Sequence, residues 1–261
     1  MPFDALKARL TEAWGAAPWE PLAASLAPMH DHLVASLAPR SGERWLDVAT
    51  GTGAVALRAA RAGADVTAQD LSPRLVERAR ELAAEEGLSV RFDVGDAEDL
   101  PYPDASFDVV SSAVGAILTP DHPAMAHQLA RVCRSGGRLG LTAWRPGVEP
   151  FQIAKRFQPP PEPGAGEREN WGREEYVRDL LGDAFELSFE PGDNTFVGSS
   201  GEELWERLVG AAGPTKVLFE SLEPERRHEL REAVTAYYES HRAGDQVRAP
   251  AAYLLILGRR R

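Results

Sequence analysis

Three acidic residues in the first half of the chain stand at the ends of predicted strands. Asp47 lies in the apolar run Trp45-Leu-Asp-Val-Ala-Thr-Gly-Thr-Gly-Ala-Val-Ala-Leu57, Asp70 ends the second predicted strand, and Asp96 follows the third. The first run leads through a Gly-x-Gly turn into small apolar residues at helical spacing, which predicts a buried strand, a tight turn and a helix. A plain dinucleotide-binding turn has no need of an acid before its first glycine. Asp47 therefore indicates a ligand with a cationic group.

The residues around these acids suggest which parts of a ligand they hold. Gly51 and Gly53 let the backbone turn sharply and approach a ligand closely, although the turn alone also fits a nicotinamide cofactor or no ligand at all. Asp70 lies at the distance from the glycines where an acid binds ribose hydroxyls; the alternative is a helix cap. Asp96, next to the backbone N–H of Ala97, could pair with an adenine edge; the alternative is an acidic surface loop.

The elements that must position these residues alternate between strand and helix. The predicted strands are 44–49, 64–69, 88–94, 107–113 and 138–144, separated by helices over 54–62, from Pro73 to Gly87, and from about Asp121 to Gly136. This alternation predicts an α/β fold with a doubly wound, mostly parallel, Rossmann-like sheet and helices on both faces. Ligands of such sheets bind beyond the carboxyl ends of the strands, where all three acids fall.

The rest of the chain is predicted to surround this core. Residues 1–40 are predicted to form a helical lid, 41–145 the ligand-binding core, 146–249 a sheet edge and helical cap for the substrate, and 250–261 a final strand and tail. Within the cap region we expect short strands at 185–189 and 195–197 and helices at 202–209 and 224–241, after a Pro- and Gly-rich loop at 158–166. The final strand is expected over 253–257.

Composition restricts the function classes. The formal net charge is -11, from 29 Lys and Arg against 40 Asp and Glu, so the surface should repel a nucleic-acid backbone. No apolar run is long enough to span a membrane, and the N-terminus lacks the pattern of a signal peptide. The single cysteine, Cys133, permits no internal disulfide, which favours a reducing cytoplasm. The oligomeric state stays open.

Five stretches in order carry a family resemblance. They are Leu46-Asp-Val-Ala-Thr-Gly-Thr-Gly53, Val66-Thr-Ala-Gln-Asp-Leu-Ser-Pro73, Gly95-Asp-Ala-Glu-Asp-Leu-Pro-Tyr-Pro103, Ser106-Phe-Asp-Val-Val110 and Leu129-Ala-Arg-Val-Cys-Arg-Ser-Gly-Gly-Arg138. Together they resemble the class I S-adenosylmethionine-dependent methyltransferases, especially the small-molecule branch of ubiquinone/menaquinone-type enzymes. The resemblance implies a seven-stranded sheet and methyl transfer from S-adenosylmethionine to a small molecule, with S-adenosylhomocysteine as product.

The resemblance also implies roles for particular residues. Asp47 and the backbone of Ala49, Thr50, Gly51 and Gly53 would face the methionine part, whose ammonium and sulfonium groups are cationic. Asp70 and Leu71 would hold the ribose, and Asp96 and Ala97 the adenine. Ser112 and its neighbours would line the methyl-donor end. Trp19 falls where related enzymes often place a Tyr over the cofactor, with helix packing as the alternative.

A base is needed only if the acceptor carries a proton with a high pKa. The candidate base is His122, which follows the fourth strand. The alternative interpretation is that His122 is exposed to solvent at the start of a helix. Asp121 is expected to cap that helix instead. His30 and His32 could reach the substrate from the lid, or could simply pack. No cluster has metal-ligand spacing, so no metal is expected.

Three alternatives remain. An NAD(P)-dependent oxidoreductase would leave Asp47 and Gly95-Asp96-Ala97 unexplained. A nucleic-acid methyltransferase conflicts with the acidic surface and with Ser111-Ser-Ala-Val-Gly115, which stands where amino-group methylases have Asn/Asp-Pro-Pro-aromatic. A cofactor-binding protein of the same fold without methyl transfer also fits, because this chemistry needs no obligatory catalytic side chain.

Overall fold

Eight strands form one central sheet in the computed structural model, which describes residues 3–261. The strand order is β3-β2-β1-β4-β5-β8-β6, and the short β7 pairs with β8. The first five strands of this order are parallel, whereas β8 is antiparallel to both β5 and β6. The bounds are β1 Arg44–Val48, β2 Asp65–Asp70, β3 Val90–Val94, β4 Phe107–Ala113, β5 Cys133–Trp144, β6 Phe185–Gly198, β7 Arg242–Ala243 and β8 Gln246–Arg260.

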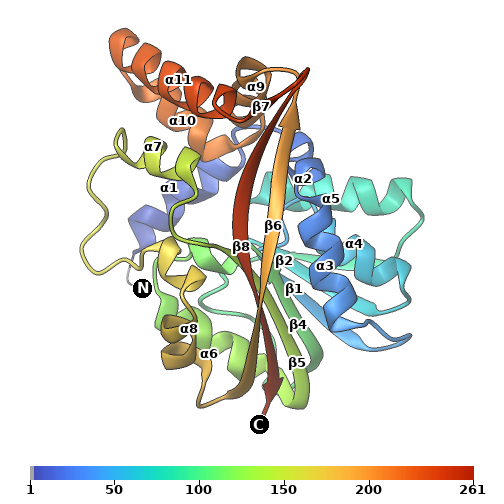
Figure 1. Ribbon diagram of the computed structural model, residues 1–261. Helices are drawn as coiled ribbons and strands as arrows, with labels where there is room; N and C mark the ends of the chain where they lie inside the picture. Colours follow the sequence, from blue (N-terminus) through green and yellow to red (C-terminus); the bar gives the residue numbers. More distant parts are fainter. Residues whose placement is uncertain (1–2) are drawn as a thin grey trace.

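Helices cover both faces of this sheet, with α3, α4 and α5 on one side and α6 and α8 on the other (Figure 1). The bounds are α1 Asp4–Trp14, α2 Glu20–Ser25, α3 Ala27–Leu37, α4 Ala54–Arg61, α5 Pro73–Glu85, α6 His122–Val132, α7 Glu149–Lys155, α8 Glu174–Leu181, α9 Gly201–Ala211, α10 Gly213–Ser221 and α11 Pro224–Glu239. Two 3-10 turns, η1 Ala116–Leu118 and η2 Arg168–Gly172, complete the list. The predicted α/β class and parallel core are confirmed.

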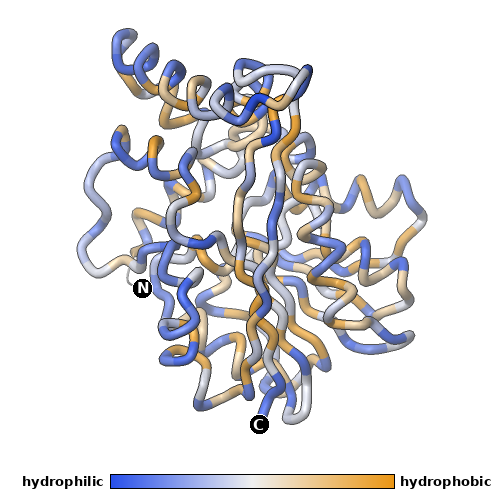
Figure 2. Tube along the Cα trace, in the orientation of Figure 1, coloured by the Kyte–Doolittle hydropathy of each residue, from blue (hydrophilic) through white to orange (hydrophobic). Residues whose placement is uncertain are grey.

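Burial on both faces explains why β1 reads as a nearly continuous apolar run. Trp45, Leu46 and Val48 of β1 are fully buried, and Figure 2 shows hydrophobic residues concentrated along the central strands. Close backbone approach helps this packing: a Cβ added to Gly140 of β5 would lie 2.6 Å from Leu37 Cδ1 of α3. The core therefore fixes the strand ends that carry the acidic residues.

The sheet extends beyond its parallel core through β6 and β8, which rise toward the helices α9, α10 and α11 (Figure 1). The two short strands expected at 185–189 and 195–197 are wrong as separate elements, because β6 is continuous from Phe185 to Gly198. Pro191 is tolerated because β6 is an edge strand, and Gly192 leaves room for the ring of Tyr253, which would lie 2.2 Å from an added Cβ.

The cap contains more helix than the sequence indicated. The helices expected at 202–209 and 224–241 correspond to α9 and α11, while α7, α8 and α10 were not predicted. These three helices have 7, 8 and 9 residues, too short for a clear helical repeat. The eighth strand, absent from the expected seven-stranded sheet, is the two-residue β7.

Candidate active site

A cavity of about 340 Å³ lies where the strands β1 to β4 end, below the lid helices and the cap. Nine of the twelve predicted site residues line it; the exceptions are Gly53, Ser112 and His122. The nine are Trp19, Asp47, Ala49, Thr50, Gly51, Asp70, Leu71, Asp96 and Ala97. Parallel strands bring these side chains together because their carboxyl ends meet at the same edge of the sheet.

The first acid, Asp47, is 1% exposed and accepts two hydroxyl hydrogen bonds. Thr50 Oγ1 donates to its Oδ2 at 2.5 Å, and Ser111 Oγ donates to its Oδ1 at 2.7 Å. Burial raises the pKa of Asp47 to about 6, because the hydrogen bonds from Thr50 and Ser111 compensate only part of the lost hydration. The site thus holds a poorly solvated carboxylate whose charge a cation would stabilise.

The glycine turn beside Asp47 has an unusual backbone. Gly51 and Gly53 have φ of +58° and +86°, and Ala49 also has a positive φ, of +53°. Such a conformation in a residue with a Cβ costs energy and is frequent at functional sites. Trp19 covers the turn, since a Cβ added to Gly51 would lie 3.4 Å from Trp19 Cδ1. Gly53 instead caps α4 and contacts the core rather than the cavity.

The second acid, Asp70, connects two loops. Its Oδ2 accepts the N–H of Gly51 at 2.8 Å, and its Oδ1 accepts the N–H of Ser72 at 2.9 Å. Burial raises the pKa of Asp70 despite these bonds. The bond to the Ser72 N–H holds the residue that precedes α5, whose own Oγ has no hydrogen-bond partner. Each carboxylate oxygen can still accept a further hydrogen bond from a ligand.

The third acid, Asp96, is bound by the lid. Lys7 Nζ of α1 lies 2.6 Å from Asp96 Oδ2 and also contacts Glu98, and the side chains of Lys7 and Glu98 are 9% and 2% exposed. Burial acts to lower the pKa of Lys7, but the two carboxylates together raise it above its ordinary value. The lid helix is therefore fastened to the loop that follows β3. Sequence reasoning missed Lys7 because a single lysine on a polar helix gives no local signal.

The end of β4 forms another part of the wall. Ser112 does not line the cavity, because its Oγ accepts the N–H of Ala116 at 2.9 Å and so fixes η1. Its neighbours Ala113, Val114 and Gly115 do line the cavity. Val114 has φ +48°, which is rare for a β-branched residue. Ser112 and its neighbours were expected to line the methyl-donor end of the site. The neighbours do line the cavity, but the side chain of Ser112 does not.

The position of His122 contradicts its expected role as a base and also the alternative of an exposed residue. Its ring is fully buried, does not line the cavity, and its Nδ1 lies 2.7 Å from Tyr176 Oη. The ring packs against Trp171, with 5.5 Å between centroids, and burial lowers its pKa to about 4. Asp121 caps α6 as expected, accepting the N–H of Ala124 at 2.9 Å.

The far side of the cavity is mostly apolar and aromatic. It includes Trp144 at the end of β5, Phe151 of α7 and Phe196 of β6, with centroid distances of 5.6 and 6.3 Å from Trp144 to the other two rings. His30 of α3 and Arg168 of η2 also line this cavity. His30 is 4% exposed, and burial lowers its pKa to about 4, so its ring is neutral at pH 7.

No group of three or more His, Cys, Asp or Glu side chains within residues 3–261 could hold a metal ion. No helix in the same range is long and apolar enough to cross a membrane.

The part of the chain that carries this geometry also matches a known protein family. A family model described as a methyltransferase domain matches residues 46–137, which run from β1 into β5 and include Asp47, Asp70 and Asp96. The match assigns residues 46–137, rather than the whole chain, to a methyltransferase domain.

Relatives with curated descriptions match more than half of the chain. A Mycobacterium tuberculosis protein described as uncharacterised is 39% identical over 167 residues, covering 60% of this chain and 59% of the relative. The 27-O-demethylrifamycin SV methyltransferase of Amycolatopsis mediterranei is 38% identical over 150 residues, covering 53% of this chain and 55% of the enzyme. The chain thus spans less than two thirds of the length of these relatives.

Solved structures share the fold of the methyltransferase domain and most of its surroundings. A Bacillus halodurans protein described as a candidate methyltransferase has a TM-score of 0.63 and 22% identity, covering 88% of this chain and 97% of its own. The [4+2]-cyclase SpnF has a TM-score of 0.58 and 24% identity, covering 90% of this chain and 80% of its own. The same fold therefore also occurs in a protein described as a cyclase.

Proposed function

We propose that the chain binds S-adenosylmethionine and transfers its methyl group to a small organic molecule. One observation carries the proposal: Asp47, Asp70 and Asp96, from the ends of three adjacent parallel strands, line one cavity together with the glycine turn. This spacing suits a ligand with a cation, a diol and an adenine in sequence. The methyltransferase domain matched over residues 46–137 supports the same assignment.

The residues present fit this cofactor. The buried carboxylate of Asp47 would accept the ammonium group, beside a glycine turn without Cβ atoms to obstruct it. Asp70 would accept hydrogen bonds from the ribose hydroxyls, and Trp19 would cover the bound molecule from the lid. Asp96 would meet the adenine amino group while sharing its carboxylate with Lys7.

The mechanism we propose relies on position rather than on proton transfer. The cofactor, when bound, supplies a methyl group on a sulfonium, which is already activated for displacement. The chain holds this group near the end of β4, and the lid and cap exclude water from the reaction. His122 is enclosed elsewhere, so the proposed mechanism includes no base at that residue.

Calorimetric titration with S-adenosylhomocysteine and with NADH and NADPH tests the cofactor. We expect micromolar binding of S-adenosylhomocysteine and none of the nicotinamides; the reverse result would contradict the proposal. Transfer of a radiolabelled methyl group from S-adenosylmethionine to a panel of small acceptors then tests the reaction. Binding without transfer to any acceptor would favour the alternative of a cofactor-binding protein that shares its fold with a cyclase.

A substitution of Lys7 tests the lid. Lys7→Met should leave the buried carboxylate of Glu98 and the partly exposed carboxylate of Asp96 without their cation, so α1 should open and let more water reach them. We expect faster amide hydrogen exchange over residues 4–14 and affinity for S-adenosylhomocysteine weaker by about tenfold, because one buried charge-assisted contact supports the closed lid.

The matched control lies on the same helix. Arg9 pairs with Glu162 at 2.6 Å, but both side chains are largely exposed. Arg9→Met should therefore change exchange and affinity by less than about twofold. Equal behaviour of the two variants would contradict a special role for Lys7.

Other parts of the proposal concern partners and location. We propose a small-molecule acceptor rather than a nucleic acid, because the site is a lidded aromatic cavity on a chain of net charge -11. We also propose a reducing cytoplasmic setting, which the single, buried Cys133 supports.

A further inference from the structure

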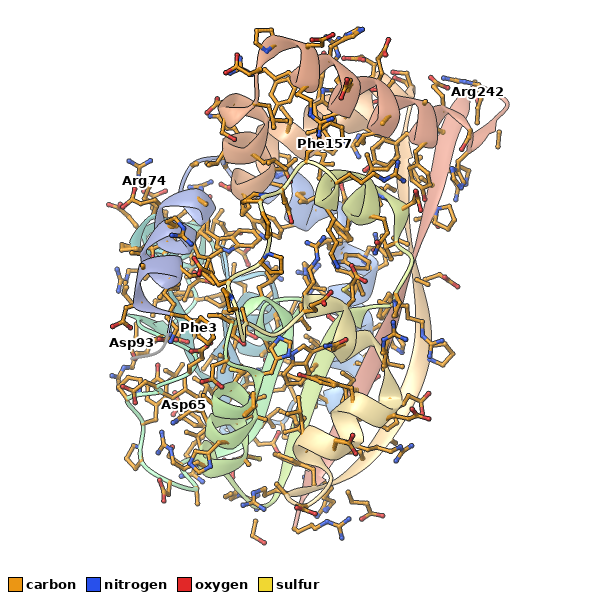
Figure 3. The ribbon with its side chains drawn as sticks, turned by 90° about the vertical axis from the view of Figure 1, so that its left-hand side faces the viewer. Phe3, Asp65, Arg74, Asp93, Phe157 and Arg242 are labelled. Atoms are coloured by element: carbon orange, nitrogen blue, oxygen red, sulfur yellow. The ribbon has the colours of Figure 1, made fainter. Side chains whose placement is uncertain are left out.

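Arg168 brings a positive charge into the apolar side of the cavity. Arg168 is the first residue of η2. The loop just before η2 is bound to the segment that follows β4, because Gly166 donates its N–H to the carbonyl of Pro120 at 2.8 Å. The guanidinium carbon lies 4.5 Å from the centre of the Phe151 ring. Figure 3 shows this side of the molecule, with the loop that leads from Phe157 toward η2 below the cap helices. The charge therefore faces a wall built from aromatic rings.

Arg168 differs from every other ring-stacked arginine within residues 3–261. The other four each have an oxygen partner in the protein in addition to the ring. They are Arg91 with Asp93, Arg178 with Glu174, Arg226 with Glu229, and Arg260 with the carbonyls of Ala130 and Ala184. Among the described residues, no oxygen lies within hydrogen-bond or ion-pair distance of the Arg168 side chain.

The neighbouring carboxylates are already bound to other groups. Gln152 Nε2 donates to Glu169 Oε1 at 2.8 Å, and Lys155 Nζ lies 2.7 Å from Glu167 Oε2 and 3.9 Å from Glu169 Oε1. Burial lowers the pKa of Arg168, with Glu169 acting in the opposite direction from a distance, but a guanidinium keeps its charge at any pH where the protein is folded. The Arg168 donors are partly exposed and have no acceptor in the protein, so they are free to bind an acceptor on a ligand in the cavity.

We propose that Arg168 binds a carboxylate on the methyl acceptor, and that the acceptor is an aromatic or similarly flat apolar acid. A guanidinium presents paired N–H donors that match the two oxygens of a carboxylate. Trp144, Phe151 and Phe196 provide the surface on which the apolar body of the acceptor lies. This inference rests on the proposed function, because it assigns the cavity beyond the cofactor to the acceptor.

The distribution of charge in the cavity supports this assignment. The three acids lie at the ends of β1 to β3, where the proposed cationic cofactor would bind, whereas Arg168 lies beyond the end of β4. Lys7, the other strongly basic residue lining the cavity, is held by Asp96 and Glu98. One side of the cavity thus favours a cation and the other favours an anion.

Two probes of equal shape test the proposal by calorimetry. We would titrate 2-naphthoate and 2-naphthamide, which differ in the charged group, into the full chain saturated with S-adenosylhomocysteine. The unsubstituted chain should bind 2-naphthoate at least about tenfold more tightly, because a charge-assisted bidentate contact is stronger than a neutral one. Arg168→Met should reduce this preference to less than about twofold, and Arg168→Lys should retain part of it.

Arg178→Met is the matched control, because Arg178 also lies 4.5 Å from a phenylalanine ring but outside the cavity. It should keep the full preference for 2-naphthoate. The proposal is overturned if the unsubstituted chain shows no such preference, whether both probes bind alike or neither binds, or if Arg168→Met keeps it. Failure to bind S-adenosylhomocysteine would instead count against the proposed function, and the two probes would then be compared on the unloaded chain.

Discussion

Asp47→Asn is expected to stabilise the protein without ligand at pH 7.5 and, at the same time, to remove most of its affinity for S-adenosylhomocysteine. Burial raises the pKa of Asp47 to about 6 from an ordinary value of 3.8. A shift of this size corresponds to a cost of about 3 kcal/mol in the free energy of unfolding when the carboxylate is charged. The neutral amide avoids that cost and can still hydrogen bond with Thr50 and Ser111.

The sign of the pH dependence follows from the raised pKa. Above pH 6 Asp47 is charged in both the folded and the unfolded chain, so the full cost is present. As the pH falls below 6, the folded chain binds a proton before the unfolded chain does, and the cost decreases, by about half at pH 5. The gain in Tm from Asp47→Asn should therefore be several degrees at pH 7.5 and clearly smaller at pH 5.

Binding should change in the opposite direction. The proposed ammonium contact is a hydrogen bond between charged groups away from water, and its loss should weaken binding by about two orders of magnitude. Calorimetry with S-adenosylhomocysteine, next to thermal unfolding of the free chain, measures both effects.

Asp65→Asn serves as the control, because Asp65 begins β2 at the opposite edge of the sheet and is exposed. It should change neither the Tm nor the affinity appreciably. If Asp47→Asn lowers the Tm at pH 7.5, the buried charge is not the cost we infer. If affinity stays within twofold of the unsubstituted chain, Asp47 does not contact the cofactor.

The three acids were predictable from sequence because their placement depends on local pattern alone. Each lies at the end of a predicted strand, and adjacent parallel strands must bring their carboxyl ends together. Nothing beyond the order of strands and helices was needed to place Asp47, Asp70 and Asp96 around one cavity. Trp19 lies over Gly51, which only the structure shows, and its contact with a cofactor stays a prediction.

Residues whose environment depends on distant segments were not predictable in this way. His122 follows the fourth strand as expected, but Trp171 and Tyr176, about fifty residues later, enclose its ring. Arg168 reaches the cavity from the first position of the short 3-10 helix η2, and nothing in its neighbouring residues distinguishes it from a surface arginine. In both cases the contacts that determine the surroundings of the side chain come from other segments of the chain, and no helical or strand repeat in the sequence links the residues in contact.

β6 shows a further limit of pattern reading. Pro191 and Gly192 interrupt the alternation of apolar residues, which predicts a turn between two short strands. The observed strand continues because its outer edge needs no N–H from Pro191 and because Tyr253 of β8 occupies the space over Gly192. Tertiary packing therefore overrides the local turn signal, and β6 continues as one strand toward the cap helices.

The second large effect is expected for Asp70→Ala, which should weaken binding of S-adenosylhomocysteine more than tenfold. The substitution removes a proposed charged acceptor of ribose hydroxyls, a contact of about 1.5–3 kcal/mol. It also removes the acceptor of the Gly51 and Ser72 N–H groups, so some of the loss would arise from a looser glycine turn. The affinity alone cannot separate these two contributions.

A change in the ligand separates them. An analogue of S-adenosylhomocysteine with 2′-deoxyribose lacks one of the hydroxyl groups that Asp70 would bind, but it meets the same glycine turn. If Asp70 binds the ribose directly, Asp70→Ala should cost much more affinity for S-adenosylhomocysteine than for the analogue, because part of the contact is already missing. Equal losses would mean that Asp70 only shapes the turn, and a loss below twofold for both would remove it from the site.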